Sequence, residues 1–302
     1  MSDRSARGDD IAVVGLACRV PGAQTPEELW QLLLEGRRAD GRAPAGRFDL
    51  TAIPAGLLQQ SEQGSYLDDV ARFDAEVFGV TDREATAMDP HQRWALELGW
   101  SALEDAGEVP GAPRDAEFGV FVGSMGADWA MEHAAGRLGP IGPSSLAGWA
   151  PSVMANRISH AFGLCGPSVV VDSGQSSSLV AVHQAVLALR AGDCTAALVV
   201  GVNLNLSTEA ATATASFGGQ SPSGLATLFE DDADGYVRGE GGAAVVLRPL
   251  ADAVRSGDRI HAVIRGWGGP KQRGGPGGGG APPPGGARGG PPAGGAPRAG
   301  SR

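Results

Sequence analysis

Five short apolar runs, each bounded by Gly, Pro or acidic residues, limit what this chain can fold into. They cover residues 11–16, 118–122, 168–171, 196–202 and 243–247. Because polar residues do not alternate with the apolar ones, the runs predict strands that are buried on both faces. Stretches with helical spacing separate the runs, so we expect an α/β protein built in layers.

The stretch from Asp89 to Gly107 gives the clearest helix prediction. Asp89 is a good N-cap, Pro90 suits the first helical position, and Gln92 would complete a capping box. Apolar residues then recur every three to four positions, and Gly107 supplies a stop signal.

Charge and hydropathy exclude two classes of protein. The chain has 24 Lys and Arg against 34 Asp and Glu, a formal net charge of −10, so a basic nucleic-acid binder is not expected. No apolar run approaches the roughly 18 residues of a membrane helix, and the first ten residues lack a signal-peptide core. We therefore expect a soluble, cytoplasmic protein.

No set of residues has the spacing of a metal site. The three cysteines, Cys18, Cys165 and Cys194, lie far apart without a CxxC pair, and we expect them to be buried free thiols. The acids Asp231, Asp232 and Asp234 resemble part of a calcium loop, but the residues that follow do not continue one. A solvated turn is the preferred interpretation.

The composition changes sharply after Trp267. Residues 268–302 contain 15 Gly, 8 Pro and 5 Lys or Arg, with no acid, Leu, Ile, Val or aromatic residue. Such a segment cannot bury enough apolar surface to offset its ordering entropy, so we expect a disordered tail. Two origins stay open: a natural flexible linker, or an out-of-frame translation of GC-rich coding sequence.

The chemistry is expected around Gln175. Residues 169–171 end a strand, residues 172–174 turn the chain, and the residues after them have the spacing of a buried helix; Leu179, Val182, Val186 and Leu189 mark one face of it. A side chain at such a turn is exposed to a pocket beside unpaired N–H groups, which suits a nucleophile or an anion-binding residue. Glutamine is not a nucleophile and can only donate and accept hydrogen bonds.

A serine hydrolase is a second interpretation of the same turn. Gly174, Gln175 and Ser176 resemble the start of a nucleophile elbow. The elbow requires Gly at position 178, where this chain has Ser178. We therefore interpret residues 176–178 as capping and helix-start residues, not as a catalytic serine.

The segment VDSGQSSSLVAVH, residues 171–183, resembles the active-site motif of the β-ketoacyl synthase domains of modular polyketide synthases. Further segments are similar to other blocks of that family: residues 11–22, 72–92, 121–129, 156–163 and 231–242. The resemblance covers nearly all of residues 9–266. It implies the thiolase-like, layered αβαβα fold, of which this chain would form the N-terminal half.

The resemblance also implies a function. In that family the position of Gln175 is normally an acyl-accepting cysteine, and glutamine there resembles the loading-module ketosynthases that decarboxylate a malonyl or methylmalonyl unit. The substrate would be carried on the phosphopantetheine of an acyl carrier protein, with no other cofactor. An acyltransferase domain and a second copy, in a homodimer, are the other implied partners. Only about eight residues precede the first strand, as expected for the first module of an assembly line.

The chain departs from the family beyond residue 266. The family continues for more than a hundred residues and contributes two histidine motifs, neither of which occurs here. The histidines present are His91, His133, His160, His183 and His261, and we assign none of them a catalytic role. We therefore expect a short N-terminus at 1–8, a truncated ketosynthase region at 9–267, a tail at 268–302, and no activity from this fragment alone. The alternatives are a non-catalytic module that binds carrier protein or synthase, and a condensing ketosynthase, which Gln175 disfavours.

Overall fold

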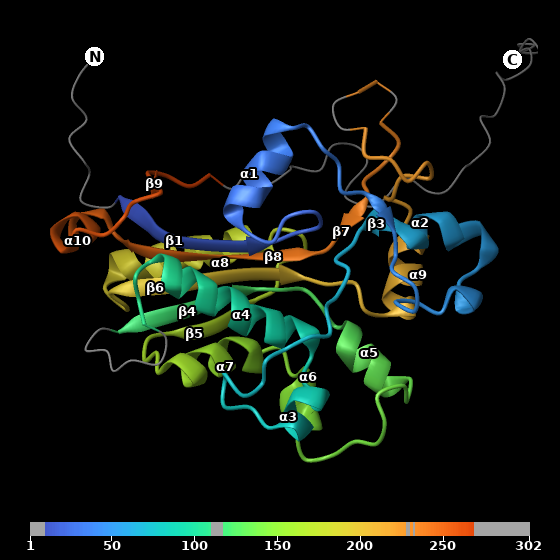
Figure 1. The fold of residues 1–302 in the computed structure, drawn as a ribbon, viewed down its shortest axis with the longest axis horizontal. Coiled ribbons are helices and arrows are strands. Elements are labelled where there is room, and N and C mark those ends of the chain that lie inside the picture. Colours follow the sequence, from blue (N-terminus) through green and yellow to red (C-terminus); the bar gives the residue numbers. More distant parts are fainter. Residues whose placement is uncertain (1–9, 110–116, 228–229, 232, 269–302) are drawn as a thin grey trace, which may run out of the picture.

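The computed structural model describes residues 10–109, 117–227, 230–231 and 233–268. Its centre is a six-stranded sheet with the order β5-β4-β6-β8-β1-β9 (Figure 1). The strands are β1 (Ile11–Arg19), β4 (Phe118–Gly123), β5 (Ser168–Val171), β6 (Ala196–Asn203), β8 (Gly241–Pro249) and β9 (Ala262–Ile264). β4 runs parallel to β5 and β6, whereas β8 is antiparallel to both β6 and β1, and β9 is antiparallel to β1.

All five apolar runs lie in this sheet, which confirms the α/β prediction. The prediction of burial on both faces is wrong for β5, where Val169 is 42% exposed. β5 is an edge strand with a single neighbour, so less of it is covered. The extended run at 260–265 contains β9, which pairs with Ile11, Ala12 and Val13 of β1 and forms the second edge strand of the sheet.

Helices cover both faces of the sheet. α4 (Pro90–Asp105) and α7 (Val153–Phe162) pack on one face, and α8 (Ser177–Ala191) packs on the other. Alternate residues of β6 point into two hydrophobic cores, one on each face of the sheet. Leu198 faces α4 and α7, and Val199 faces α8. The result is an α/β/α arrangement in which α8 forms the third layer and contacts β4, β5, β6 and β8.

The start of α4 confirms one prediction and corrects another. Asp89 caps the helix, since its Oδ1 accepts the N–H of His91 at 2.8 Å. The capping box does not form: the Gln92 amide donates instead to the carbonyls of Ala147 and Gly148. The Asp89 N–H that Gln92 would have bonded donates to the Gly148 carbonyl, so α6 (Ser145–Trp149) supplies the acceptor in place of the box.

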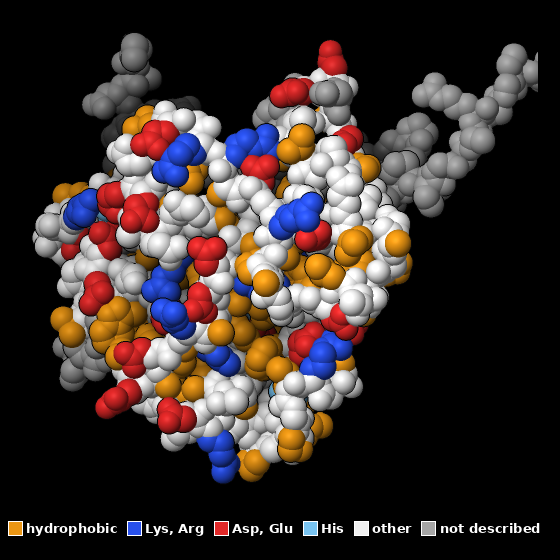
Figure 2. Space-filling view, turned by 45° about the vertical axis from the view of Figure 1, so that its right-hand side comes forward, with side chains coloured by type: hydrophobic (Ala, Val, Ile, Leu, Met, Phe, Trp, Pro, Cys, Tyr) orange, Lys and Arg blue, Asp and Glu red, His pale blue; other side chains and the backbone are white. Residues whose placement is uncertain are grey.

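A second, three-stranded sheet lies at one end of the molecule (Figure 1). Its strands are β2 (Gly41–Arg42), β3 (Gln63–Ser65) and β7 (Arg238–Gly239). The remaining helices are α1 (Pro26–Leu34), η1 (Leu50–Ala52), η2 (Ala55–Leu57), α2 (Leu58–Glu62), α3 (Asp82–Ala87), α5 (Asp128–Ala134), α6 (Ser145–Trp149), α9 (Thr208–Ser216) and α10 (Leu250–Ser256). Figure 2 brings this end forward and shows acidic and basic side chains interspersed over it.

The short N-terminus at 1–8 and nearly all of the tail, from residue 269, lie outside the described residues. None of the helices among the described residues has the length and hydropathy of a membrane span.

Candidate active site

Gln175 stands in the turn between β5 and α8. Gly174 adopts a φ of 68°, a left-handed conformation that favours glycine and reverses the chain within a few residues. The carboxylate of Asp172 accepts the Gly174 N–H at 3.0 Å and fixes the turn. Gln175 lies in this turn, and α8 begins two residues later, at Ser177. The predicted strand–turn–helix is therefore present.

The hydroxyls next to Gln175 hold the turn. Ser176 Oγ donates to the Ser173 carbonyl at 3.0 Å and contacts the Ser173 hydroxyl. Ser177 Oγ accepts the Ser173 N–H at 3.0 Å and donates to the Gly174 carbonyl at 2.6 Å. Ser176 occupies the N-cap position as predicted, but its side chain bonds backwards and does not cap α8. Both hydroxyls already have partners within the turn, which supports their structural role.

The first turn of α8 lies very close to the sheet. A Cβ atom on Gly123, at the end of β4, would lie 2.5 Å from the backbone N and Cα of Ser178. A Cβ on Gly201 of β6 would lie 2.7 Å from Ser178 Cβ. Because Ser178 faces the sheet, Leu179 points away and is 69% exposed, contrary to its predicted place on the buried face; Val186 and Leu189 are buried as predicted.

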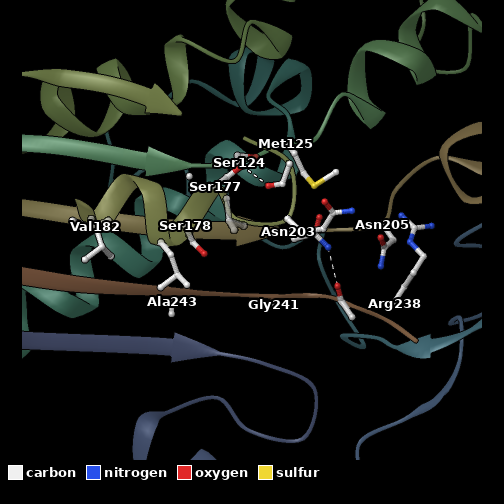
Figure 3. Close-up of a pocket in the computed structure, with 18 of the residues that line it drawn as sticks. Ser124, Met125, Ser177, Ser178, Val182, Asn203, Asn205, Arg238, Gly241 and Ala243 are labelled. Carbon is white, nitrogen blue, oxygen red and sulfur yellow. Dashed lines mark hydrogen bonds between the residues drawn. The ribbon is translucent and has the colours of Figure 1, made fainter. Parts of the chain in front are cut away.

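A cavity of about 630 Å³ opens beside this turn, and Gly174 and Gln175 line it. The other walls come from the first turn of α8, the ends of β4 and β6, and the β7–β8 segment (Figure 3). Apolar residues such as Met125, Val202 and Ala243 form much of its surface. Gln175 is exposed and lies next to the N-terminus of α8. An amide and the N–H groups of a helix start can both donate hydrogen bonds to an oxygen atom.

The loop after β6 forms one wall and is held by buried side chains. His91 Nε2 accepts the N–H of Leu204 at 2.9 Å, and Glu240 Oε1 accepts the N–H of Asn205 at 2.9 Å. Asp128 Oδ2 accepts the next two N–H groups, at 2.8 and 3.0 Å. Four successive N–H groups thus have partners from distant parts of the chain, which fixes the loop.

Glu240 joins this loop to a buried ion pair. Its carboxylate pairs with the Arg47 guanidinium and also accepts the Leu67 N–H at 2.9 Å. Burial raises the pKa of Glu240, and the Arg47 charge and the backbone donors oppose that shift. The sequence analysis did not single out Glu240. A lone Glu among glycines just before an apolar strand could have indicated a buried acid.

None of the five histidines is among the described residues that line the cavity. His91 is buried against Asp89, and His261 Nε2 contacts Asp105 at 2.8 Å. His133 packs between Trp129 and Trp149, and His183 stacks on Trp267 with ring centroids 4.0 Å apart. His160 is exposed near the end of α7.

The cysteine prediction is correct for two residues and wrong for the third. Cys18 and Cys194 are buried, and burial raises the pKa of both thiols, that of Cys194 to about 11. Cys165 is exposed, because it lies in the loop that leads to the edge strand β5. Cys165 does not line the cavity.

The acidic turn at residues 231–234 is only partly described. In the described part of the chain, no cluster of three His, Cys, Asp or Glu side chains could hold a metal ion. Asp234 is bonded locally, and a hydrogen bond from Ser221 lowers its pKa. Asp231 is exposed, and Asp232 lies outside the described residues.

Comparison with known families gives one match over most of the chain. Residues 8–253 match the family described as "Beta-ketoacyl synthase, N-terminal domain". Similar curated proteins include the polyketide synthase GfsA of Streptomyces halstedii, 48% identical over 264 residues. The polyketide synthase ThaG of Burkholderia thailandensis is 43% identical over 266 residues. Each alignment covers 86% of this chain but only 4% of GfsA and 5% of ThaG.

Solved structures show the same fold. The oxazolomycin ketosynthase domain OzmH KS7 of Streptomyces albus superposes with a TM-score of 0.77 at 36% identity, over 85% of this chain and 45% of that one. The ketosynthase from module 6 of the bacillaene synthase of Bacillus subtilis gives a TM-score of 0.73 at 33% identity, over 84% and 42%. The thiolase-like fold is therefore confirmed, and the chain spans less than half the length of these domains.

Proposed function

Because the chain belongs to the β-ketoacyl synthase family and is similar to the ketosynthases of polyketide synthases, we propose that it is part of a loading-module ketosynthase that decarboxylates a malonyl or methylmalonyl unit. The unit would be bound as a thioester to an acyl carrier protein. The observation that carries the proposal is Gln175, placed at the strand–turn–helix beside the cavity.

Glutamine at this position is compatible with decarboxylation but not with condensation. Condensation requires a covalent acyl-enzyme, and therefore a nucleophile at the turn. The Gln175 amide cannot attack a thioester, but it can donate a hydrogen bond. Ser176 and Ser177, the neighbouring hydroxyls, are already bonded within the turn. A malonyl thioester can therefore be bound here without being transferred to the protein.

The proposed step is a simple C–C cleavage. The bond between the carboxylate carbon and the α-carbon breaks, CO₂ leaves, and the bonding electron pair forms the thioester enolate. A proton from water then adds to the α-carbon and gives an acetyl or propionyl thioester. Charge develops on the thioester oxygen, so an N–H donor fixed at that oxygen lowers the barrier. In our proposal Gln175 and the N-terminus of α8 supply such donors.

Further donors would come from sequence beyond the aligned region. A single neutral donor is worth only about 3–4 kcal/mol of barrier, and no histidine lines the cavity among the described residues. The solved ketosynthases extend to more than twice the aligned length. By the family resemblance we propose that the corresponding segment supplies two histidines and covers the exposed face of α8. A carrier protein, an acyltransferase domain and a second copy are proposed as partners on the same ground.

The test measures CO₂ release from malonyl carrier protein. The chain is joined in frame to the segment that completes a related ketosynthase, and the parent is compared with Gln175→Ala and Gln184→Ala. Gln184 is an exposed glutamine on the same helix that does not line the cavity. We expect CO₂ release by the parent, a loss of roughly 10- to 1,000-fold in Gln175→Ala, and no loss in Gln184→Ala. Binding of carrier protein without CO₂ release by the parent would favour a non-catalytic module.

A further inference from the structure

Among the residues that the structure describes, three polar side chains in the cavity wall carry buried atoms without a hydrogen-bond partner. They are the Oγ of Ser124, both amide atoms of Asn205, and the Nη1 of Arg238. Asn205 is 1% exposed and Ser124 is 8% exposed, so surrounding water does not reach them as it reaches a surface group. Buried polar atoms are nearly always paired in folded proteins, so unpaired ones around one cavity favour a ligand there.

Other polar residues of the same wall differ, because their groups are already bonded. The Asn203 amide donates to the Gly239 carbonyl at 2.8 Å (Figure 3). Thr214 Oγ1 donates to the Ala210 carbonyl at 2.7 Å. The unpaired atoms are therefore a property of Ser124, Asn205 and Arg238, and not of every polar residue around the cavity.

The fold holds these three side chains in place from separate elements. Ser124 follows the end of β4, Asn205 lies in the bonded loop after β6, and Arg238 begins β7. The Asn205 N–H is fixed by Glu240, and its carbonyl accepts from Arg47. In Figure 3, Asn205 and Arg238 lie at the end of the cavity away from Val182. The unpaired groups are thus on rigid backbone, as a binding site requires.

The chemistry of the free groups fits an anion with two oxygens. Asn205 offers an amide N–H, Ser124 a hydroxyl, and Arg238 a charged N–H. No Asp or Glu is among the described residues that line the cavity. The nearby carboxylate of Glu240 is paired with Arg47 and does not neutralise Arg238. A positive charge and neutral donors beside apolar walls bind a carboxylate in preference to an uncharged acyl group.

We propose that Ser124, Asn205 and Arg238 form a carboxylate subsite, which binds the free carboxylate of a malonyl-type thioester whose carbonyl lies at Gln175. This inference rests on the proposed function and adds to it the group that selects the substrate. Asn205 is the central residue, because it is the most buried of the three and its Nδ2, a donor that a carboxylate can accept from, has no partner in the described part of the chain.

The stability of an Asn205 variant distinguishes an asparagine that binds a ligand from one that holds the fold together. Replacing Asn205 by Leu removes two unpaired polar atoms from a buried position while leaving its backbone bonds in place. The variant should therefore be more stable, with a Tm higher by roughly 2–4 °C, and yet bind the substrate more weakly. An asparagine that held the fold together would give the opposite change in Tm.

The test is calorimetric titration of the 302-residue chain with two pantetheine amides, in which nitrogen replaces the thioester sulfur. One carries a malonyl group and the other an acetyl group. We expect the malonyl amide to bind at least about ten-fold more tightly, and Asn205→Leu and Asn205→Asp to lose this preference. Thr214→Val, which removes a hydroxyl that is already bonded, should keep it. Equal binding of the two amides by the parent, or an unchanged preference in Asn205→Leu, would overturn the subsite.

The decarboxylation assay separates this inference from the proposed function. A malonyl preference that depends on Asn205, without CO₂ release by the completed domain, would leave the subsite standing and contradict the decarboxylase. CO₂ release whose KM is the same in the parent and in Asn205→Leu would support the decarboxylase and refute the subsite.

Discussion

The Nε2 atom of His91 accepts the backbone N–H of Leu204 at 2.9 Å, across 113 positions of sequence. Its Nδ1 lies 2.7 Å from the Asp89 carboxylate. An Nε2 that accepts has no proton, so His91 is held as the neutral Nδ1–H tautomer between the start of α4 and the loop after β6. A histidine fixed in this way is a structural link, not a proton donor for the cavity.

His91→Ala should therefore lower the stability strongly. The change leaves the Leu204 N–H without its partner and removes a buried partner of the Asp89 carboxylate, and it opens a void where the imidazole packs against Gly126. We expect the free energy of unfolding to fall by about 2–4 kcal/mol, measured by urea titration. His160→Ala, at an exposed position near the end of α7, is the control and should cost at most about 1 kcal/mol. Equal losses in the two variants would contradict the role given to His91.

The close approach of α8 to the sheet predicts that one substitution in α8, Ser178→Gly, restores the stability of one glycine variant and not of another. Gly201→Ala places a Cβ against the Ser178 side chain, and Gly123→Ala places one against the Ser178 backbone. Both should lower Tm, because the helix start must shift. Ser178→Gly removes the side-chain contact only, so it should restore part of the Tm of Gly201→Ala and none of that of Gly123→Ala. Gly56→Ala, with open space around it, should change Tm little; rescue of both glycine variants would refute this packing.

The three thiols should react at very different rates. Cys165 is exposed, whereas Cys194 is buried with a pKa of about 11. Since only the thiolate reacts with iodoacetamide, a raised pKa slows alkylation at pH values near 8. Peptide mass mapping of the native chain should find Cys165 labelled first, and Cys18 and Cys194 labelled only slowly or after unfolding. Early labelling of Cys194 would show that its position is not buried.

The outward face of α8 should drive self-association. Leu179 is 69% exposed and Leu187 is 45% exposed on this helix, and exposed apolar clusters promote association. We expect the 302-residue chain to sediment as oligomers at micromolar concentration. Replacing both residues by Gln should shift it towards the monomer, whereas replacing the exposed Val254 of α10 by Gln should not. A monodisperse monomeric parent would contradict this expectation.

The sequence alone predicted those elements whose own residues form a recognisable pattern. The central strands are apolar runs, and the turn at Gly174 and Gln175 follows a run of three valines. β3 and β7 were missed, because each has two or three residues and Gly64 pairs with Arg238, far along the chain. The same reason hid Asn205: its burial and its free amide depend on Glu240, which holds its N–H from the β7–β8 segment.

The capping box failed for a related reason. Asp89 and Gln92 have the right spacing for one, but α6 presents the Gly148 carbonyl to both of them. A tertiary acceptor thus replaced a local one, and nothing in the sequence near α4 indicates it. Cys165 was placed wrongly because its apolar surroundings in sequence do not reveal that β5 is an edge strand.

If Gln175 stands where a nucleophile would act, the completed domain cannot form an acyl-enzyme. Intact mass measurement after incubation of the completed domain with malonyl carrier protein tests this most directly, with CO₂ release followed in the same sample. We predict CO₂ release and no added mass for the parent. Gln175→Cys should gain one acyl group, because the N-terminus of α8 favours a thiolate at that position. An acyl adduct on the parent, at Gln175 or at Ser176, would contradict the account.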